Sequence, residues 1–251
     1  MKNKKLIYLK NKFEKNGWVV LRKLYKQSEI NLIAKTINEY LKNQMKKEIQ
    51  PRNINFVGKS KNLNSINSFH NLNNCKKIKY LSSSHKITKI ISFFLDSTPE
   101  FRSCEFFAKP AKFGLPSPNH QDNYYWGVKG SNALTIWISL DKSYKKNGAV
   151  HYYNGTHKFG ILKHKPSFAK GSSQKISDEK FLLQFKKSQP VLYPGDALIH
   201  HSLVVHGSEA NHSNESRRGW TIQFKDKKAK YDKEQILNYE KSLYKQISSR
   251  L

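Results

Sequence analysis

The sequence predicts a mainly β protein in which short strands form a sandwich, a barrel or a jelly roll, with helices packed outside. Two observations lead to this class. Apolar and aromatic runs of strand length recur through the second half of the chain, and residues typical of turns separate them. The chain has 251 residues, which is enough to bury a core in one domain. We therefore expect residues 1–251 to form a single domain.

The predicted strands share a high content of β-branched, apolar and aromatic residues. They cover residues 101–109, 133–140, 148–153, 191–193, 197–206 and 218–224. Prolines and a glycine within 110–118 predict an irregular loop, and Pro194-Gly195-Asp196 predicts a turn. Several short strands separated by such signals are typical of the three architectures named above.

Three other segments predict helices. Residues 28–47 carry an apolar stripe, with Ser28 as the expected N-cap; residues 75–95 predict one or two helices; and residues 232–251 predict an amphipathic helix. The last helix could pack on the sheet or on a second subunit, and the sequence leaves both open. Residues 48–74, rich in Asn, Lys and Ser, predict a disordered segment or an active-site lid with some order at 68–72.

Two histidines and one aspartate suggest a metal site. The chain contains one His-x-Asp, His120-Gln121-Asp122, and a later histidine, His206. In extended backbone, residues i and i+2 point to the same face, so His120 and Asp122 could reach one ion. Two His and one carboxylate are the ligands of non-haem Fe(II) sites that keep open positions. The motif alone is common by chance, so its context matters.

Arginine placement adds to this hypothesis. The chain has only six arginines among 46 basic residues, yet Arg217 and Arg218 stand just beyond His206-Gly207-Ser208. A guanidinium can hold a carboxylate through two parallel bonds, which lysine cannot reproduce. On a strand the two arginines point to opposite faces, so only one can enter a pocket. Arg217 lies eleven residues after His206 and Arg218 twelve, and the residues alone leave both open.

Candidate substrate contacts follow the metal segment directly. Asn123, Tyr124 and Trp126 could touch a substrate or simply pack the mouth of the fold, and the residues favour neither alternative. Lys109 could point inward and hold an anionic group. Because the chain is rich in lysine, the presence of Lys109 at this position is only weak support for an anion-binding role.

The chain resembles the phytanoyl-CoA dioxygenase family of Fe(II)/2-oxoglutarate oxygenases from residue 13 to about residue 225. Residues 13–21 resemble the family's opening glycine and hydrophobic strand, and 134–141 its central strand. The other matching motifs are Lys109-Pro110, His120-Gln121-Asp122-Asn123, Asn147-Gly148-Ala149-Val150, Pro194-Gly195-Asp196 and His206-Gly207-Ser208 with Asn211 and Arg217. Asn154-Gly155-Thr156-His157 departs mildly from the family's usual Pro-Gly-Ser-His.

The resemblance implies a double-stranded β-helix, a cupin-like jelly roll, and a role for each matching residue. It implies His120, Asp122 and His206 as Fe(II) ligands. It further implies that Arg217 and Ser208 bind the distal carboxylate of 2-oxoglutarate, and that Trp137 lines the cosubstrate pocket. The implied reaction consumes 2-oxoglutarate and O2, releases succinate and CO2, and usually hydroxylates an aliphatic C–H bond of a small molecule.

Charge and cysteine content bear on partners and location. The formal net charge is +28, with 46 basic and 18 acidic residues. Because lysine is spread along the chain, we interpret this charge as compositional bias more readily than as a nucleic-acid surface. An anionic or thioester-linked substrate is a third option. Two isolated cysteines and no membrane-length apolar run predict a cytoplasmic protein.

Two alternative functions stay open at this stage. One is a catalytically degenerate family member that binds a ligand without turnover. The other is a basic nucleic-acid-binding protein in which the metal motif is incidental.

Overall fold

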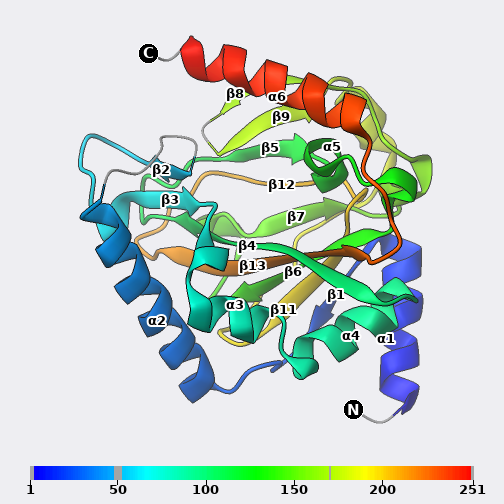
Figure 1. The fold of residues 1–251 in the computed structure, drawn as a ribbon, viewed down its shortest axis with the longest axis horizontal. Coiled ribbons are helices and arrows are strands. Elements are labelled where there is room, and N and C mark those ends of the chain that lie inside the picture. Colours follow the sequence, from blue (N-terminus) through cyan, green and yellow to red (C-terminus); the bar gives the residue numbers. More distant parts are fainter. Residues whose placement is uncertain (1–2, 48–52, 170, 250–251) are drawn as a thin grey trace.

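The computed structural model describes residues 3–47, 53–169 and 171–249. Two antiparallel sheets face each other in a jelly roll, with helices outside (Figure 1), which confirms the predicted fold class. The major sheet has the order β1 (Trp18–Leu21), β11 (Ala197–His201), β6 (Ala133–Ser139), β13 (Arg217–Asp226), β4 (Pro99–Lys109), β3 (Ile66–Phe69) and β2 (Ile54–Phe56). The minor sheet has the order β10 (Lys187–Ser188), β7 (Val150–Tyr153), β12 (His206–Ser208) and β5 (Ser117–His120).

The remaining elements lie around these sheets. A separate hairpin is formed by β8 (His164–Ala169) and β9 (Ser172–Ile176). The helices are α1 (Asn3–Asn16), α2 (Gln27–Met45), α3 (Lys76–Ser82), α4 (His85–Leu95), α5 (Asp122–Trp126) and α6 (Lys233–Ser248). Figure 1 shows α2, α3 and α4 on one side of the major sheet and the minor sheet on the other side.

Period-two alternation separates two faces of the major sheet. Along β13, Trp220, Ile222 and Phe224 belong to the main hydrophobic core, whereas Thr221 and Gln223 line a cavity between the sheets. The same alternation runs through β4 and β6, because successive side chains of a strand point to opposite faces. The apolar face therefore binds the helices, and the opposite face is left free for polar side chains.

Helices cover the apolar face of the major sheet. In α2, Ile30, Ile33, Ile37 and Leu41 are all buried against it, at the spacing expected of one helical face. Burial of each such side chain contributes about 1.5–3 kcal/mol to stability. Helix α2 begins one residue before the expected N-cap, Ser28, and its N-terminus is held by a hydrogen bond from Lys26 N to Glu29.

The predicted strand 197–206 is two strands. β11 ends at His201, and the chain then crosses from the major to the minor sheet, where β12 begins at His206. A turn at the crossing is closed by the hydrogen bond from Val204 N to His201 O. The sequence shows no break here because the crossing residues, including Leu203 and Val204, are themselves apolar and buried.

Other boundaries also differ from expectation. Residues 191–193 form only an isolated bridge between Ser143 and Leu192. Residues 53–74, expected to be disordered or a lid, supply β2 and β3 to the major sheet; residues 48–52 lie outside the described part. Helix α1 and the hairpin of β8 and β9 were not predicted from the sequence.

The C-terminal helix packs on its own chain. Helix α6 lies across the hairpin of β8 and β9 (Figure 1) and near α5. Gln235 donates to the backbone oxygens of Asn123 and Tyr124, and Gln246 accepts from Phe168 N. Residues 250 and 251 of the predicted helix lie outside the described part. None of the described helices combines the length and apolar character needed to cross a bilayer.

Candidate active site

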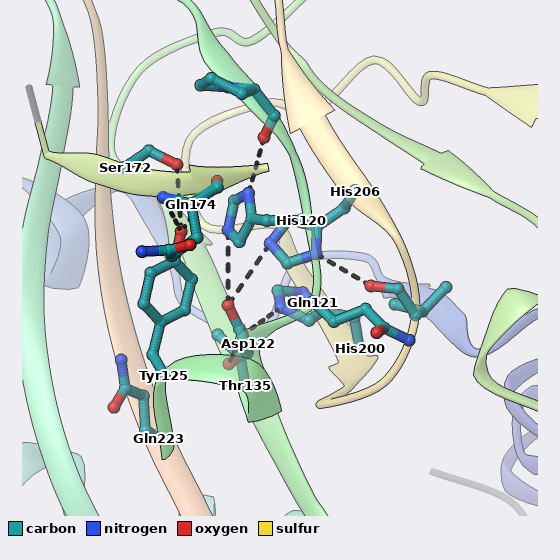
Figure 2. Close-up of polar contacts among 12 residues, drawn as sticks. His120, Gln121, Asp122, Tyr125, Thr135, Ser172, Gln174, His200, His206 and Gln223 are labelled. Atoms are coloured by element: carbon teal, nitrogen blue, oxygen red, sulfur yellow. Dashed lines mark hydrogen bonds and ion pairs between the residues drawn. The ribbon is translucent and has the colours of Figure 1, made fainter. Parts of the chain in front are cut away.

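His120, Asp122 and His206 converge between the two sheets. One potential ligand atom from each residue lies within 4.8 Å of the other two. Register pairing brings this about, since His206 of β12 stands opposite His120 of β5. Asp122 opens α5 directly after β5 and is not in extended backbone, but it still reaches the same point (Figure 2).

Backbone carbonyls orient both histidines. His120 Nδ1 lies 2.7 Å from Pro118 O, and His206 Nδ1 lies 3.0 Å from Val204 O. These contacts place the protons on Nδ1 and leave each Nε2 lone pair facing Asp122 Oδ1, at 3.7 Å and 3.6 Å respectively. Burial, and secondarily His120, lower the pKa of His206 well below its usual value. A neutral imidazole held in one tautomer is the form that binds a metal ion.

The second oxygen of Asp122 is held by the major sheet. Thr135 donates to Oδ2 at 2.6 Å, and His200 Nε2 lies 3.0 Å from the same atom (Figure 2). His200 Nδ1 is in turn 3.0 Å from the Tyr152 hydroxyl. Burial alone would raise the pKa of Asp122, but the surrounding histidines, His206 first, hold it well below its usual range. The result is an oriented carboxylate with Oδ1 free for an ion.

Gln121 fixes the turn between the two ligand residues of this segment. Its side-chain amide donates to Gly160 O and Leu203 O, and its carbonyl accepts from Leu162 N. The side chain is fully buried. A rigid loop of this kind lowers the cost of assembling a three-ligand site.

A first cavity, the Arg217 cavity, adjoins the cluster and has a volume of about 100 Å³. Its polar wall is formed by Lys109, Thr135, Ser208, Arg217, Thr221 and Gln223, and Trp137 lines it as well. The guanidinium of Arg217 lies 5.2 Å from the Trp137 ring centroid. The structure thus brings together the three residues expected to bind the cosubstrate, Arg217, Ser208 and Trp137.

Among the residues that the structure describes, none forms an ion pair with Arg217. The residue is 3% exposed, and its Nε is buried without a hydrogen-bond partner. Burial lowers the pKa of Arg217 to about 10, so it stays charged at neutral pH. A buried, charged and incompletely bonded guanidinium fits a carboxylate ligand, since such a group is costly to leave unpaired.

Gly219 allows the close approach of Trp137 to β13. A Cβ atom at position 219 would stand 2.1 Å from the indole ring, a distance that no side chain tolerates. The Trp137 ring can therefore approach the backbone of β13 closely, next to Arg217.

Lys109 belongs to the same cavity. It pairs in register with Arg217 across β4 and β13 and is 2% exposed. Its ammonium donates to Leu115 O. Burial, followed by repulsion from Arg217, lowers the pKa of Lys109 well below its usual value. The structure thus groups Lys109 with Arg217 and away from the second cavity, described next.

A second cavity, the Arg102 cavity, opens on the other side of the cluster and has a volume of about 330 Å³. His120 and Asp122 form part of its wall. These two residues also line the Arg217 cavity, as do Glu105, Phe107 and Gln223. The hairpin of β8 and β9 contributes Ser172 and Ser173, and α6 contributes Tyr239, Leu243 and Ile247. The C-terminal helix thus covers a cavity that contacts the ligand cluster.

The expected substrate contacts separate in the structure. Trp126 lines the Arg102 cavity. Asn123 instead exchanges hydrogen bonds with the backbone of Val128, and Tyr124 stacks on His164 at 4.1 Å. Neither lines a described cavity wall, so both are better explained as packing residues, the alternative that the sequence left open. Tyr125, their neighbour, lines the Arg102 cavity and bonds to Gln174.

Several residues of the site were not predicted. Thr135 and Gln223 share a strand face with Trp137 and Arg217, so strict period-two counting from those residues would have found them. The same counting back from Lys109 would have found Glu105, whereas Arg102 gave no such signal because a bulge interrupts the alternation there.

The fold and the ligand cluster together define a cupin-like double-stranded β-helix with a candidate mononuclear metal site. The chain belongs to the phytanoyl-CoA dioxygenase family: the model described as Phytanoyl-CoA dioxygenase (PhyH) matches residues 13–219. This match confirms the resemblance found in the sequence.

Curated relatives support the family. One from Caenorhabditis briggsae, named phytanoyl-CoA dioxygenase domain-containing protein 1 homolog, is 27% identical over 170 residues, covering 59% of this chain and 54% of the relative. Another from Stutzerimonas stutzeri is named probable alpha-ketoglutarate-dependent hypophosphite dioxygenase. It is 30% identical over 143 residues, which cover 55% of this chain and 49% of the relative. The chain therefore matches about half the length of these relatives.

Solved structures share the fold. EctD from S. alaskensis, solved with bound Fe, has a TM-score of 0.75 at 16% identity and covers 93% of this chain and 79% of its own. SnoK, a non-heme alpha ketoglutarate dependent carbocyclase from nogalamycin biosynthesis, has a TM-score of 0.72 at 18% identity. The match covers 89% of this chain and 85% of SnoK.

Proposed function

We propose that this chain is an Fe(II)/2-oxoglutarate-dependent oxygenase that hydroxylates an aliphatic C–H bond of a small molecule. The observation that carries the proposal is the convergence of His120, Asp122 and His206, with ligand atoms within 4.8 Å of one another. Two imidazoles and one carboxylate suit Fe(II) and leave positions for cosubstrate and O2. Membership of the phytanoyl-CoA dioxygenase family supports the same assignment.

Each group around the cluster has a defined task in this proposal. Bound iron would supply O2 activation, with 2-oxoglutarate as the co-reductant that leaves as succinate and CO2. Thr135 and His200 hold Asp122 Oδ2, so that Oδ1 faces the ion. Arg217, with Ser208 and Lys109 beside it, holds the distal carboxylate of 2-oxoglutarate in the Arg217 cavity. Lys109 is thereby proposed as a cosubstrate contact in place of a substrate contact.

The substrate would occupy the Arg102 cavity. That cavity touches the ligand residues His120 and Asp122 and is lined by Trp126 and Tyr125. A volume of about 330 Å³ is at the lower end of the range for small-molecule pockets. We propose a small metabolite as the partner and not a nucleic acid, because the cluster lies in a cavity between the sheets. A reducing cytoplasm suits Fe(II) and the two free, buried cysteines.

The proposal is tested by Fe(II)-dependent consumption of 2-oxoglutarate under O2. We expect slow succinate release without substrate, faster release when a substrate is present, and incorporation of one oxygen atom from ¹⁸O2 into each hydroxylated product. Asp122→Ala is the inactive control. Binding of Fe(II) and 2-oxoglutarate without any succinate release would identify a degenerate ligand-binding member. Failure to bind either, together with salt-dependent retention on DNA, would favour the nucleic-acid alternative.

A further inference from the structure

Among the described residues that line the Arg102 cavity, Arg102 carries the single guanidinium, and Glu105 and Asp122 carry the carboxylates. Trp126 lies beneath Arg102, with the guanidinium carbon 4.9 Å from the ring centroid. Gln223 and Glu105 lie on the strand face beside Arg102, and Leu243 and Ile247 of α6 line the wall as apolar groups. A ligand here would therefore meet a cation and an apolar surface together.

A β-bulge points Arg102 into this cavity. Gln223 of β13 pairs with Ser103 of β4, but the next residue, Phe224, pairs with Phe101, so Arg102 is an extra residue. Regular alternation would put Arg102 on the helix-covered face with Cys104. Instead Arg102 and Ser103 both donate to Gln223 Oε1, at 2.6 Å and 2.7 Å. Bulges beside active sites commonly redirect a side chain in this way.

The carboxylates of Glu105 and Asp122 attract the charge of Arg102 without forming an ion pair with it. Both oxygens of the neighbouring Glu105 are occupied, one by His70 at 3.1 Å and the other by Gln223 at 3.0 Å. Within residues 3–47, 53–169 and 171–249, no carboxylate forms an ion pair with Arg102, which also interacts with the Tyr231 side chain. Its Nε is buried without a hydrogen-bond partner. Arg102 is half-buried, and a guanidinium that is partly removed from water without a direct anionic partner favours an anion supplied from outside.

Described lysines do not fill this role. None of them lines the Arg102 cavity. Lys112 and Lys129, which flank the metal segment in the sequence, are exposed to solvent, and Lys109 lies in the Arg217 cavity. The high lysine content therefore does not account for a specific anion site, whereas the single arginine does.

We propose that Arg102 binds an oxyanion group of the substrate, a carboxylate or a phosphonate, so that the substrate is a small organic anion. Its aliphatic part would lie between Trp126 and the side chains of α6, with a C–H bond presented toward His120 and Asp122. This inference rests on the proposed oxygenase function. It adds the substrate class and the residue that selects it.

The test uses four probes of similar size: butanoate, propylphosphonate, butanamide and butylammonium. Each is titrated calorimetrically, without O2, into protein carrying Fe(II) and saturating 2-oxoglutarate. We expect at least one anion to bind about tenfold or more tightly than butanamide, and Arg102→Gln to remove this preference. Arg102→Lys should restore it only in part, because an ammonium lacks the planar fork. Which anion binds distinguishes a carboxylate from a phosphonate.

Controls separate the possible failures. Lys112→Gln and Lys129→Gln remove exposed charges and should leave anion binding unchanged. The 2-oxoglutarate titration of each variant, run first, reports on folding and on the proposed function independently of Arg102. If wild-type protein binds 2-oxoglutarate but neither anion, prefers butylammonium, or keeps its anion preference in Arg102→Gln, the inference is wrong while the proposed function stands.

Discussion

Arg217 and Arg218 are consecutive in β13 but point to opposite faces of the major sheet. Arg217 is buried between the sheets beside Trp137. Arg218 forms a two-pronged pair with Asp141, with its Nε 2.8 Å from Oδ2 and its Nη2 2.7 Å from Oδ1. That pairing raises the pKa of Arg218. One arginine is thus committed to a partner within the protein, and its neighbour is available to a ligand.

Arg217→Ala should raise the KM for 2-oxoglutarate by about one to two decades, from loss of a charge-assisted bond worth about 1.5–3 kcal/mol. Arg218→Ala should leave that KM nearly unchanged and lower the melting temperature instead, because Asp141 loses its partner. Steady-state kinetics and thermal unfolding of the two variants check this. The reverse pattern would assign the cosubstrate to Arg218.

Removal of a proposed ligand should abolish tight metal binding without unfolding the protein. We expect Asp122→Ala and His206→Ala to lose at least about tenfold in Fe(II) affinity, since each contributes one of three protein ligands. His212→Ala, which changes an exposed histidine, is the matched control. Anaerobic Fe(II) titration with circular dichroism provides the measurement. Wild-type affinity in either ligand variant would contradict the assignment.

Lys109 should make cosubstrate binding depend on pH. Burial and the nearby Arg217 lower the pKa of Lys109, and only the protonated ammonium attracts the 2-oxoglutarate carboxylate. The Kd for 2-oxoglutarate should therefore rise as pH increases through that lowered pKa, earlier than for an exposed lysine. Lys109→Met should bind 2-oxoglutarate more weakly than wild type at pH values below that lowered pKa and should lose this pH dependence. A Kd that is flat with pH in wild-type protein would remove Lys109 from the cosubstrate site.

His164 should couple folding to acid. Burial lowers the pKa of His164 from its ordinary 6.5 to about 4, and its Nε2 accepts a hydrogen bond from Gln121 N at 3.1 Å. Between these pH values His164 is therefore protonated in the unfolded chain but neutral in the folded protein. The free energy of unfolding should fall as pH drops through this range, with a contribution from His164 of up to about 3 kcal/mol.

Denaturant unfolding of wild-type protein and His164→Gln between pH 7 and 4 measures that contribution. The free energy of unfolding of the variant should decrease less over this range. The slope of that free energy against pH should correspond to up to one proton fewer taken up on unfolding. Equal slopes for the two proteins would show that His164 is not the responsible group.

The sequence by itself determined which side chains share a face. Alternation along a strand placed the consecutive residues Arg217 and Arg218 on opposite sides, and the His-x-Asp motif with the family motifs indicated the ligand set. These features are local, because strand geometry alone dictates the direction of successive side chains.

Tertiary structure decided which strands meet and where alternation is interrupted. The crossing between His201 and His206 moves His206 into the minor sheet and into register with His120. The bulge at Arg102 turns a side chain from the helix-covered face into a cavity, and α6 closes that cavity over Trp126 and Tyr125. Strand pairing and bulges depend on contacts between residues far apart in the chain, and no local pattern of residue types specifies those contacts.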